Sequence, residues 1–153
     1  MTDGPQQVVR LERRGEIGLL WLDRPPVNAI DLSVLRQADD RLAELEQGTD
    51  VGAVVFTGAG RCLSAGLDLK AVPRYSPAEQ RETILTLNRV VTRLYRLPIP
   101  TVAAVNGHAI AGGLVLVLAC DYRIGKTRVV CNPRGYAPDE LNPRFDPELV
   151  VDI

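Results

Sequence analysis

The first 125 residues alternate short apolar runs with segments of helical periodicity, and this alternation limits the chain to folds that mix strands with helices. Two apolar runs, 8–12 and 17–22, flank Arg14-Gly15 and predict an N-terminal hairpin. Further strands are expected in the later apolar runs at 51–57, 101–105 and 122–124. Helical segments separate these later runs, so the pattern predicts an α/β fold.

Two of the expected helices have clear boundaries. The first follows Asp31 or Ser33, either of which can act as its N-cap, and it ends at Gly48. The second begins at Ser76-Pro77-Ala78-Glu79, a capping box with proline at the first helical position. Apolar spacing predicts the buried faces, Leu35, Ala38, Leu42 and Leu45 in the first helix and Ile84, Leu87, Val91 and Leu94 in the second. A third helix at 114–119 is apolar enough to predict burial.

Composition excludes several classes of protein. The 153 residues hold 18 Lys+Arg and 19 Asp+Glu, and a net charge of −1 argues against a nucleic-acid binder. Three cysteines and one histidine predict neither a zinc site nor a disulfide framework. The N-terminus has no apolar run typical of a secretory signal, and 109–120 is shorter than the ~18 residues of a membrane span. We therefore expect a cytoplasmic protein without membrane contact.

Residues 126–153 differ from the rest of the chain. They contain four of the eleven prolines and one of the thirteen glycines. Apart from 149–151, they show no helical or strand period. We expect an α/β domain in 1–125 and a divergent, Pro-rich, poorly ordered tail in 126–153.

The glycine-rich loop at 58–66 allows more than one interpretation. Gly58 and Gly60 follow a strand, as in a dinucleotide-binding fingerprint, but Leu63 stands where the third glycine would be, which favours a simple turn. Ser64 lacks the upstream glycine of a nucleophile elbow. Cys62 occupies that upstream position and is interpreted as a small buried thiol.

A second glycine-rich loop, 107–113, leads into the apolar helix. Free N–H groups at a helix start carry partial positive charge, and glycines let a ligand oxygen approach them. The loop therefore has the parts of a backbone oxyanion site. Tight packing of these glycines against a core helix is the alternative. His108, the only histidine, is either a pocket-lining residue or a general base.

Two segments carry a family resemblance. The segment 56–69 ends in Ser-Ala-Gly-Leu-Asp-Leu, and 100–113 contains Pro-Thr-Val-Ala-Ala-Val-Asn-Gly followed by Ala-Gly-Gly. Ala-Cys-Asp-Tyr-Arg-Ile follows at 119–124, and Leu-Asp-Arg-Pro at 22–25 precedes Asn28-Ala29. In this order the motifs resemble the enoyl-CoA hydratase/isomerase family, the crotonase superfamily, over residues 8–125.

The resemblance implies a crotonase-like spiral of ββα units, incomplete in a chain of this length. It also implies that an acyl-CoA thioester binds with its carbonyl oxygen between the backbone N–H groups of Leu67 and Gly112. The residues implied to line the substrate and its CoA moiety are Asn28, Ala29, Ala65, Gly66, Asp68, Leu69 and Gly113. Coenzyme A belongs to the substrate, so no resident cofactor and no metal are implied. The resemblance further implies assembly into a homo-trimer or hexamer, and we expect the C-terminal interface of that assembly to be missing from this chain.

The chain also departs from the family pattern. Hydratases of the family carry a glutamate three residues after the oxyanion glycine, where this chain has Val115. The later glutamate of isomerase-like members would fall near Gly135 or Tyr136, and Glu140 lies in a different context. Descent from a lyase or isomerase therefore leaves two possibilities, an acyl-CoA-binding protein that stabilises an enolate and an inactive truncated paralogue or partner-binding fragment. Truncation or a frame shift after Gly125 is a further hypothesis.

Overall fold

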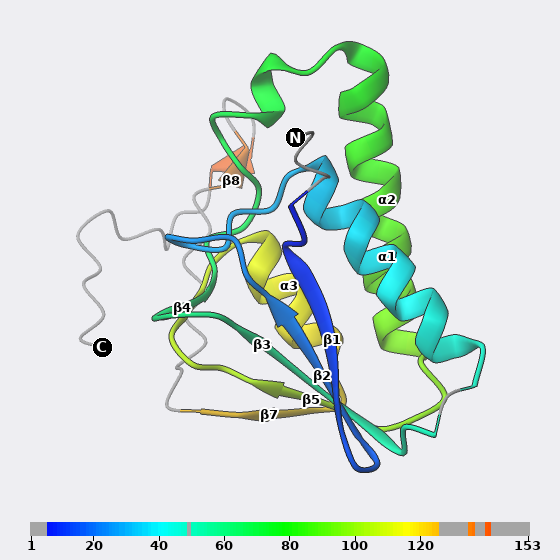
Figure 1. Cartoon of the computed structure of the whole chain (residues 1–153). Coiled ribbons are helices and arrows are strands. Elements are labelled where there is room, and N and C mark those ends of the chain that lie inside the picture. Colours follow the sequence, from blue (N-terminus) through cyan, green and yellow to red (C-terminus); the bar gives the residue numbers. More distant parts are fainter. Residues whose placement is uncertain (1–5, 49, 126–134, 137–139, 142–153) are drawn as a thin grey trace.

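The computed structural model describes residues 6–48, 50–125, 135–136 and 140–141. Its main sheet has five strands in the order β1-β2-β3-β5-β7 (Figure 1). These strands are β1 (Val9–Arg14), β2 (Ile17–Leu22), β3 (Ala53–Gly58), β5 (Thr101–Ala104) and β7 (Tyr122–Ile124). β1 and β2 form the predicted antiparallel hairpin, and every later pairing in this sheet is parallel. The predicted α/β class is confirmed.

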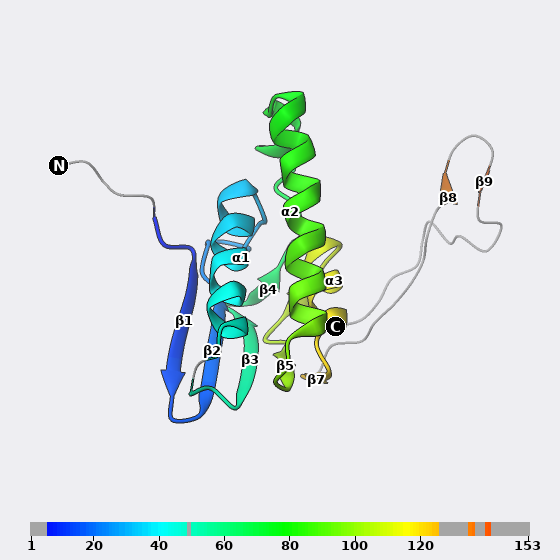
Figure 2. The same ribbon diagram turned by 90° about the vertical axis from the view of Figure 1, so that its right-hand side faces the viewer.

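Three helices connect the parallel strands: α1 (Leu32–Glu46), α2 (Pro77–Arg96) and α3 (Gly112–Ala119). Asp31 is the N-cap of α1, and its carboxylate accepts a hydrogen bond from the Val34 N–H at 2.9 Å. The predicted capping box of α2 is present, with Ser76 and Glu79 each accepting from the other's backbone N–H. Figure 2 shows α1 and α2 side by side in front of the sheet.

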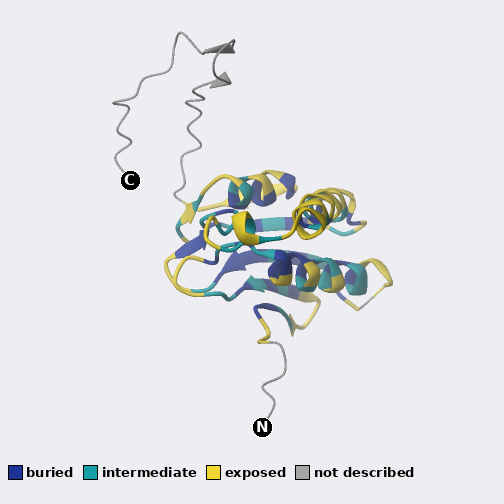
Figure 3. Cartoon of the chain, turned by 90° about the horizontal axis from the view of Figure 1, so that it is seen from above, coloured by how far each residue is buried: buried dark blue, intermediate teal, exposed yellow. Residues whose placement is uncertain are grey.

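One face of the sheet carries the core. Alternate strand residues, among them Leu20, Val54 and Ala103, join one buried cluster with the inward faces of all three helices. The neighbouring strand residues Leu19 and Val55 are only half-buried, because they point to the other side of the sheet. Figure 3 shows the same division, with the exposed residues gathered on the outer sides of the helices.

Two helix predictions need correction. In α2 the fully buried positions are Thr83, Thr86, Val90 and Leu94, whereas Ile84 is 49% exposed. Threonine can be buried here because its hydroxyl donates within its own helix, as Thr83 Oγ1 does to the Glu79 carbonyl at 2.8 Å. In α3 the predicted burial holds for one face only, with Leu116, Val117 and Ala119 buried, whereas Val115 and Leu118 are both nearly half exposed.

Both glycine-rich loops contain short strands that the sequence analysis missed. β4 (Cys62–Ser64) and β6 (His108–Ala109) pair in parallel and form a second, two-stranded sheet. A 3₁₀ turn, η1 (Val72–Arg74), precedes α2. The β4–β6 pair places the two glycine-rich loops beside each other.

Most of the tail lies outside the described residues, so its expected disorder stays a prediction. Two short strands within it, β8 (Gly135–Tyr136) and β9 (Glu140–Leu141), pair antiparallel. None of the helices in the described part of the chain is both long and apolar enough to span a bilayer.

Candidate oxyanion site

The two backbone amides expected to form an oxyanion hole are neighbours in the structure. A Cβ built on Gly112 would lie 3.7 Å from the Leu67 nitrogen. A Cβ built on Gly66 would lie 3.0 Å from the Gly112 nitrogen and 2.7 Å from the Ile110 carbonyl oxygen. Gly66 also has a φ of +84°, which glycine adopts without strain. Glycine at position 66 therefore lets the two chain segments approach this closely.

Both amides are available as donors. Among the described residues, neither the Leu67 N–H nor the Gly112 N–H donates to a protein acceptor. Their neighbours are engaged, since the Asp68 N–H donates to the Ile30 carbonyl and the Gly113 N–H to the Ile110 carbonyl. Gly112 is the first residue of α3, where the helix dipole places positive potential. The arrangement can bind an oxygen that carries partial negative charge.

The start of α3 is held in an unusual conformation. Ala111, its N-cap, has a φ of +46°, which is rare for a residue with a Cβ. Behind it, a Cβ on Gly113 would come within 2.5 Å of the Ser64 carbonyl oxygen, so α3 rests directly on β4. The sequence pattern predicts a close approach at Gly113, but no pattern in the sequence predicts the positive φ of Ala111.

The Leu67 amide is flanked by hydrogen bonds to a parallel segment. Ile30 N–H donates to the Gly66 carbonyl at 2.8 Å, and Asp68 N–H donates to the Ile30 carbonyl at 2.8 Å. The Ala65 N–H likewise donates to the Val27 carbonyl at 2.9 Å. Segments 27–30 and 65–68 therefore hold each other in register on both sides of Leu67.

Arg24 fixes the same segments electrostatically. Its Nη1 donates to Asp68 Oδ2 at 2.8 Å and to the Ala29 carbonyl at 3.0 Å, and its Nη2 pairs with Asp31 at 3.0 Å. The Arg24 hydrogen bond, aided by the backbone N–H groups of Ala71 and Lys70, holds the pKa of Asp68 below its usual range. The resemblance implies that Asp68 lines the CoA site. In the structure its carboxylate accepts hydrogen bonds from Arg24 and from the backbone N–H groups of Lys70 and Ala71.

The other implied lining residues lie around the amide pair. Ala29 and Ala65 are half-buried, Leu69 is 82% exposed, and Gly66 and Gly113 are buried. Asn28 is 1% exposed, and its backbone and side chain already have protein partners. The structure favours a supporting role for Asn28 over the implied contact with CoA.

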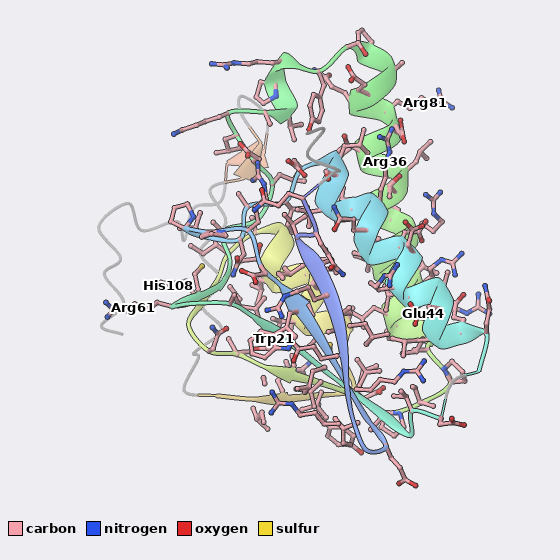
Figure 4. The ribbon with its side chains drawn as sticks, viewed as in Figure 1. Trp21, Arg36, Glu44, Arg61, Arg81 and His108 are labelled. Carbon is pink, nitrogen blue, oxygen red and sulfur yellow. The ribbon has the colours of Figure 1, made fainter. Side chains whose placement is uncertain are left out.

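The alternative site residues have structural partners. Ser64 is fully buried, and its hydroxyl donates to the Asn28 carbonyl while accepting from the Gly66 N–H. Cys62 is buried, burial raises the pKa of its thiol, and the thiol donates to the His108 carbonyl. His108 is exposed on β6, near Arg61 in Figure 4.

The Gly58-Ala59-Gly60 turn is held by protein groups. Asn106 Nδ2 donates to the Gly58 and Gly60 carbonyls at 2.8 and 2.9 Å. A Cβ on Gly58 would lie 2.5 Å from the Cys62 carbonyl oxygen. These contacts support the simple turn over a dinucleotide-binding loop.

Val115, where the resemblance implies a glutamate in hydratases, lies in the first turn of α3 and is 45% exposed. It has no titratable group, so no proton can be transferred from this position. Glu140 lies in β9, where only the backbone is described. No group of three His, Cys, Asp or Glu side chains in the described ranges could hold a metal ion.

Comparison with known proteins identifies the family of the chain. The model of the enoyl-CoA hydratase/isomerase family matches residues 12–130. The chain belongs to the enoyl-CoA hydratase/isomerase family. It is 35% identical over 121 residues to a short-chain-enoyl-CoA hydratase of Clostridium acetobutylicum, covering 78% of this chain and 46% of that protein.

Two further relatives extend the comparison. A 4-chlorobenzoyl coenzyme A dehalogenase of an Arthrobacter species is 32% identical over 160 residues, covering 98% of this chain and 58% of its own. The crystal structure of an enoyl-CoA hydratase from Bacillus anthracis superimposes with a TM-score of 0.72 at 28% identity, covering 76% of this chain and 46% of that one. This chain therefore has part of the crotonase fold, and it spans about half the length of these relatives.

Several residues that shape the site were not assigned a role from the sequence. Arg24 lies within the Leu-Asp-Arg-Pro motif, and an arginine that follows Asp23, precedes two prolines and is close in sequence to Asp31 is a usable signal for an ion-paired loop. Asn106 also stood in a motif, but its bonds to the Gly58–Gly60 turn depend on strand pairing that single-sequence patterns do not specify.

Proposed function

We propose that this chain binds acyl-CoA thioesters with the thioester carbonyl oxygen between the N–H groups of Leu67 and Gly112. The observation that carries the proposal is a pair of neighbouring amides, that of Leu67 in the loop after β4 and that of Gly112 at the start of α3, neither of which donates to an acceptor among the described residues. Two N–H donors facing one oxygen stabilise the negative charge that develops when a proton leaves the α-carbon of the thioester. Names of relatives that include enoyl-CoA and benzoyl coenzyme A substrates support the same class of ligand.

Within this proposal the described residues supply charge stabilisation rather than proton transfer. An oxyanion hole lowers the free energy of an enolate, but a positioned acid or base must move the proton. Val115 cannot do so, which favours binding of thioesters over hydration of a double bond. Cytoplasmic location and assembly into trimers or hexamers stay predictions.

Ligand binding tests the proposal directly. We expect butyryl-CoA to raise the melting temperature of the chain, because a ligand of the folded state stabilises it by mass action. A CoA thioether of the same length, which lacks the carbonyl oxygen, is the matched control and should bind more weakly. NAD should give no shift. Equal binding of the thioester and the thioether would contradict a carbonyl-binding site.

A pair of variants tests the Gly112 amide. Gly112→Pro removes the N–H at the first helical position, where proline is tolerated, whereas Gly112→Ala keeps it and adds a Cβ with no heavy atom nearer than 3.7 Å. Loss of one oxyanion donor weakens transition-state stabilisation by roughly 10²-fold or more in enzymes. We expect thioester binding to fall in the proline variant only, with circular dichroism as the check on folding.

A second pair tests the missing proton-transfer group. Val115→Glu places a carboxyl group on the first turn of α3, and Val115→Gln is its uncharged counterpart. We expect weak hydration of crotonyl-CoA with glutamate and none with glutamine. Complete inactivity of a well-folded, thioester-binding glutamate variant would argue against the assignment of position 115.

A further inference from the structure

Asn28 is a buried side chain with three hydrogen bonds in the loops around the amide pair. It is 1% exposed and has a φ of +49°, a conformation that asparagine tolerates better than most residues. Its Nδ2 donates to the Ala59 carbonyl at 2.9 Å and to the Cys62 carbonyl at 2.7 Å. Its Oδ1 accepts from the Arg24 N–H at 2.9 Å. One side chain therefore ties the turn at 24–28 to the glycine-rich loop 58–66 at two points.

The backbone of Asn28 continues this connection toward Leu67. The Asn28 carbonyl accepts from Ser64 Oγ at 2.7 Å, and Ser64 Oγ accepts from the Gly66 N–H at 3.1 Å. Ile30, two residues after Asn28, bonds to both Gly66 and Asp68. The peptide on each side of Leu67 is thus fixed by the segment that Asn28 anchors.

The second amide depends on the same support. The Ser64 carbonyl accepts from the Ile110 N–H at 2.9 Å, and Gly113 packs against Ser64. Ser64 therefore touches both the loop that carries Leu67 and the turn that carries Gly112. The Ser64 hydroxyl donates to the backbone carbonyl of Asn28. The Asn28 side chain also binds the carbonyl of Cys62, which is the first residue of the strand that contains Ser64.

We propose that Asn28 is a positioning residue whose side chain sets the Leu67 N–H relative to the Gly112 N–H. This inference rests on the proposed function, because the two amides matter only if they bind a thioester oxygen. The effect of Asn28 on the position of the Leu67 amide can nevertheless be tested without a ligand. Misplacement of a binding group by about 1 Å is enough to reduce catalysis by about 10²-fold, so small loop shifts matter at such a site.

Two variants separate the side chain from the backbone conformation. Asn28→Gly keeps access to a positive φ and removes all three side-chain bonds. Asn28→Asp keeps a side-chain acceptor for the Arg24 N–H but directs a carboxylate oxygen at the carbonyls of Ala59 and Cys62. The matched control is Asn106→Asp, because Asn106 is exposed and donates to two carbonyls of the same turn, and none of its hydrogen bonds to described residues involves Ser64 or Gly66.

Two readouts are measured on each variant. The first is the ¹⁵N–¹H resonance and the hydrogen exchange of the Leu67 and Gly112 amides without ligand. The second is the ¹³C shift of carbonyl-labelled butyryl-CoA, which reports hydrogen bonding to the thioester oxygen. We expect both Asn28 variants to move the Leu67 resonance, to abolish the bound carbonyl shift and to weaken binding by at least about tenfold. Asn106→Asp should leave these readouts near the parent values.

The outcomes separate the two proposals. An unmoved Leu67 resonance in folded Asn28→Gly, or an equal change in Asn106→Asp, overturns the positioning role of Asn28. Absence of a carbonyl shift in the parent chain overturns the proposed function, while the amide resonances still decide the positioning role. Where both Asn28 variants fail to fold, Ser64→Ala removes the hydroxyl that joins the Asn28 carbonyl to the Gly66 N–H, and an unmoved Leu67 resonance in that variant overturns the proposed path from Asn28 to Leu67.

Discussion

Gly66 is the residue on which the amide pair most directly depends. Both Gly66 and Gly60 have a positive φ, +84° and +76°, but only Gly66 has backbone atoms within 3 Å of a built Cβ. An alanine at either position carries the strain of a left-handed conformation, about 1–2 kcal/mol. At Gly66 alone the methyl group also separates the two segments.

Substitution of these two glycines therefore gives a matched prediction. Gly66→Ala should lower the free energy of unfolding by about 1–3 kcal/mol more than Gly60→Ala, because overpacking adds to the strain. It should also abolish thioester binding, which Gly60→Ala should preserve. Urea unfolding and a butyryl-CoA titration measure both effects. Equal losses in the two variants would contradict the close approach at Gly66.

Asp68 gives a prediction for acid stability. The hydrogen bond from Arg24 is the main reason that the pKa of Asp68 is lowered in the folded state, so folding favours the charged form of its carboxyl group. The stabilisation is fully present above the ordinary pKa of 3.8 and is lost as the pH falls through the lower folded value. In Asp68→Asn the urea midpoint should therefore be lower at neutral pH and should vary less below about pH 5 than in the parent chain. Asp40→Asn, on the exposed side of α1, should follow the parent curve.

At the scale of elements, the strands of the main sheet and the starts of α1 and α2 could be predicted from the sequence, because turn and capping chemistry is local. Ser76, Pro77 and Glu79 specify the start of α2 without reference to the rest of the chain. The buried face of α2 could not be predicted as well, because Thr83 and Thr86 satisfy their hydroxyls within or beside the helix and replace aliphatic residues in the core. The β4–β6 pair escaped prediction because two- and three-residue strands have no measurable period.

The candidate site divides in the same way. The motifs placed Leu67 and Gly112, and the structure brings these two amides together. The bonds of Asn28 to Ala59 and Cys62 join residues more than thirty positions apart, and such partners depend on the whole fold.

Asp31 joins a helix start to the loop network, and two substitutions separate its contributions. Its Oδ1 caps α1 and its Oδ2 pairs with Arg24 at 3.0 Å. Asp31→Ser keeps a capping oxygen and should lower the free energy of unfolding by less than about 1 kcal/mol, the range for a partly exposed ion pair. Asp31→Ala also removes the cap and should lower it by about 1 kcal/mol more. Urea unfolding measures both variants, and an equal loss would show that the cap contributes nothing.

At the scale of the whole molecule, the sheet face opposite the helices is apolar and partly open. Strand register places Leu19, Val55, Val102 and Tyr122 in one row across four strands. Tyr122 is 64% exposed at the edge of this row. Apolar surface of this kind favours association between copies of a chain.

Two exposed tyrosines test this expectation. Tyr122→Lys places a charge at the edge of the apolar row, whereas Tyr95→Lys changes a tyrosine that is 74% exposed on α2. Sedimentation velocity over a range of concentrations should show less self-association for Tyr122→Lys than for the parent chain. Tyr95→Lys should behave as the parent does. The same result for both variants would mean that the sheet face does not drive association.

The order of the strands in the main sheet, β1-β2-β3-β5-β7, also follows their order along the chain. Each new strand joins the open edge left by the one before it, and no strand has to be inserted between two that are already paired. β4 and β6 obey the same order in the second sheet. A ribosome releases the chain from its N-terminus, so both sheets can grow strand by strand during synthesis.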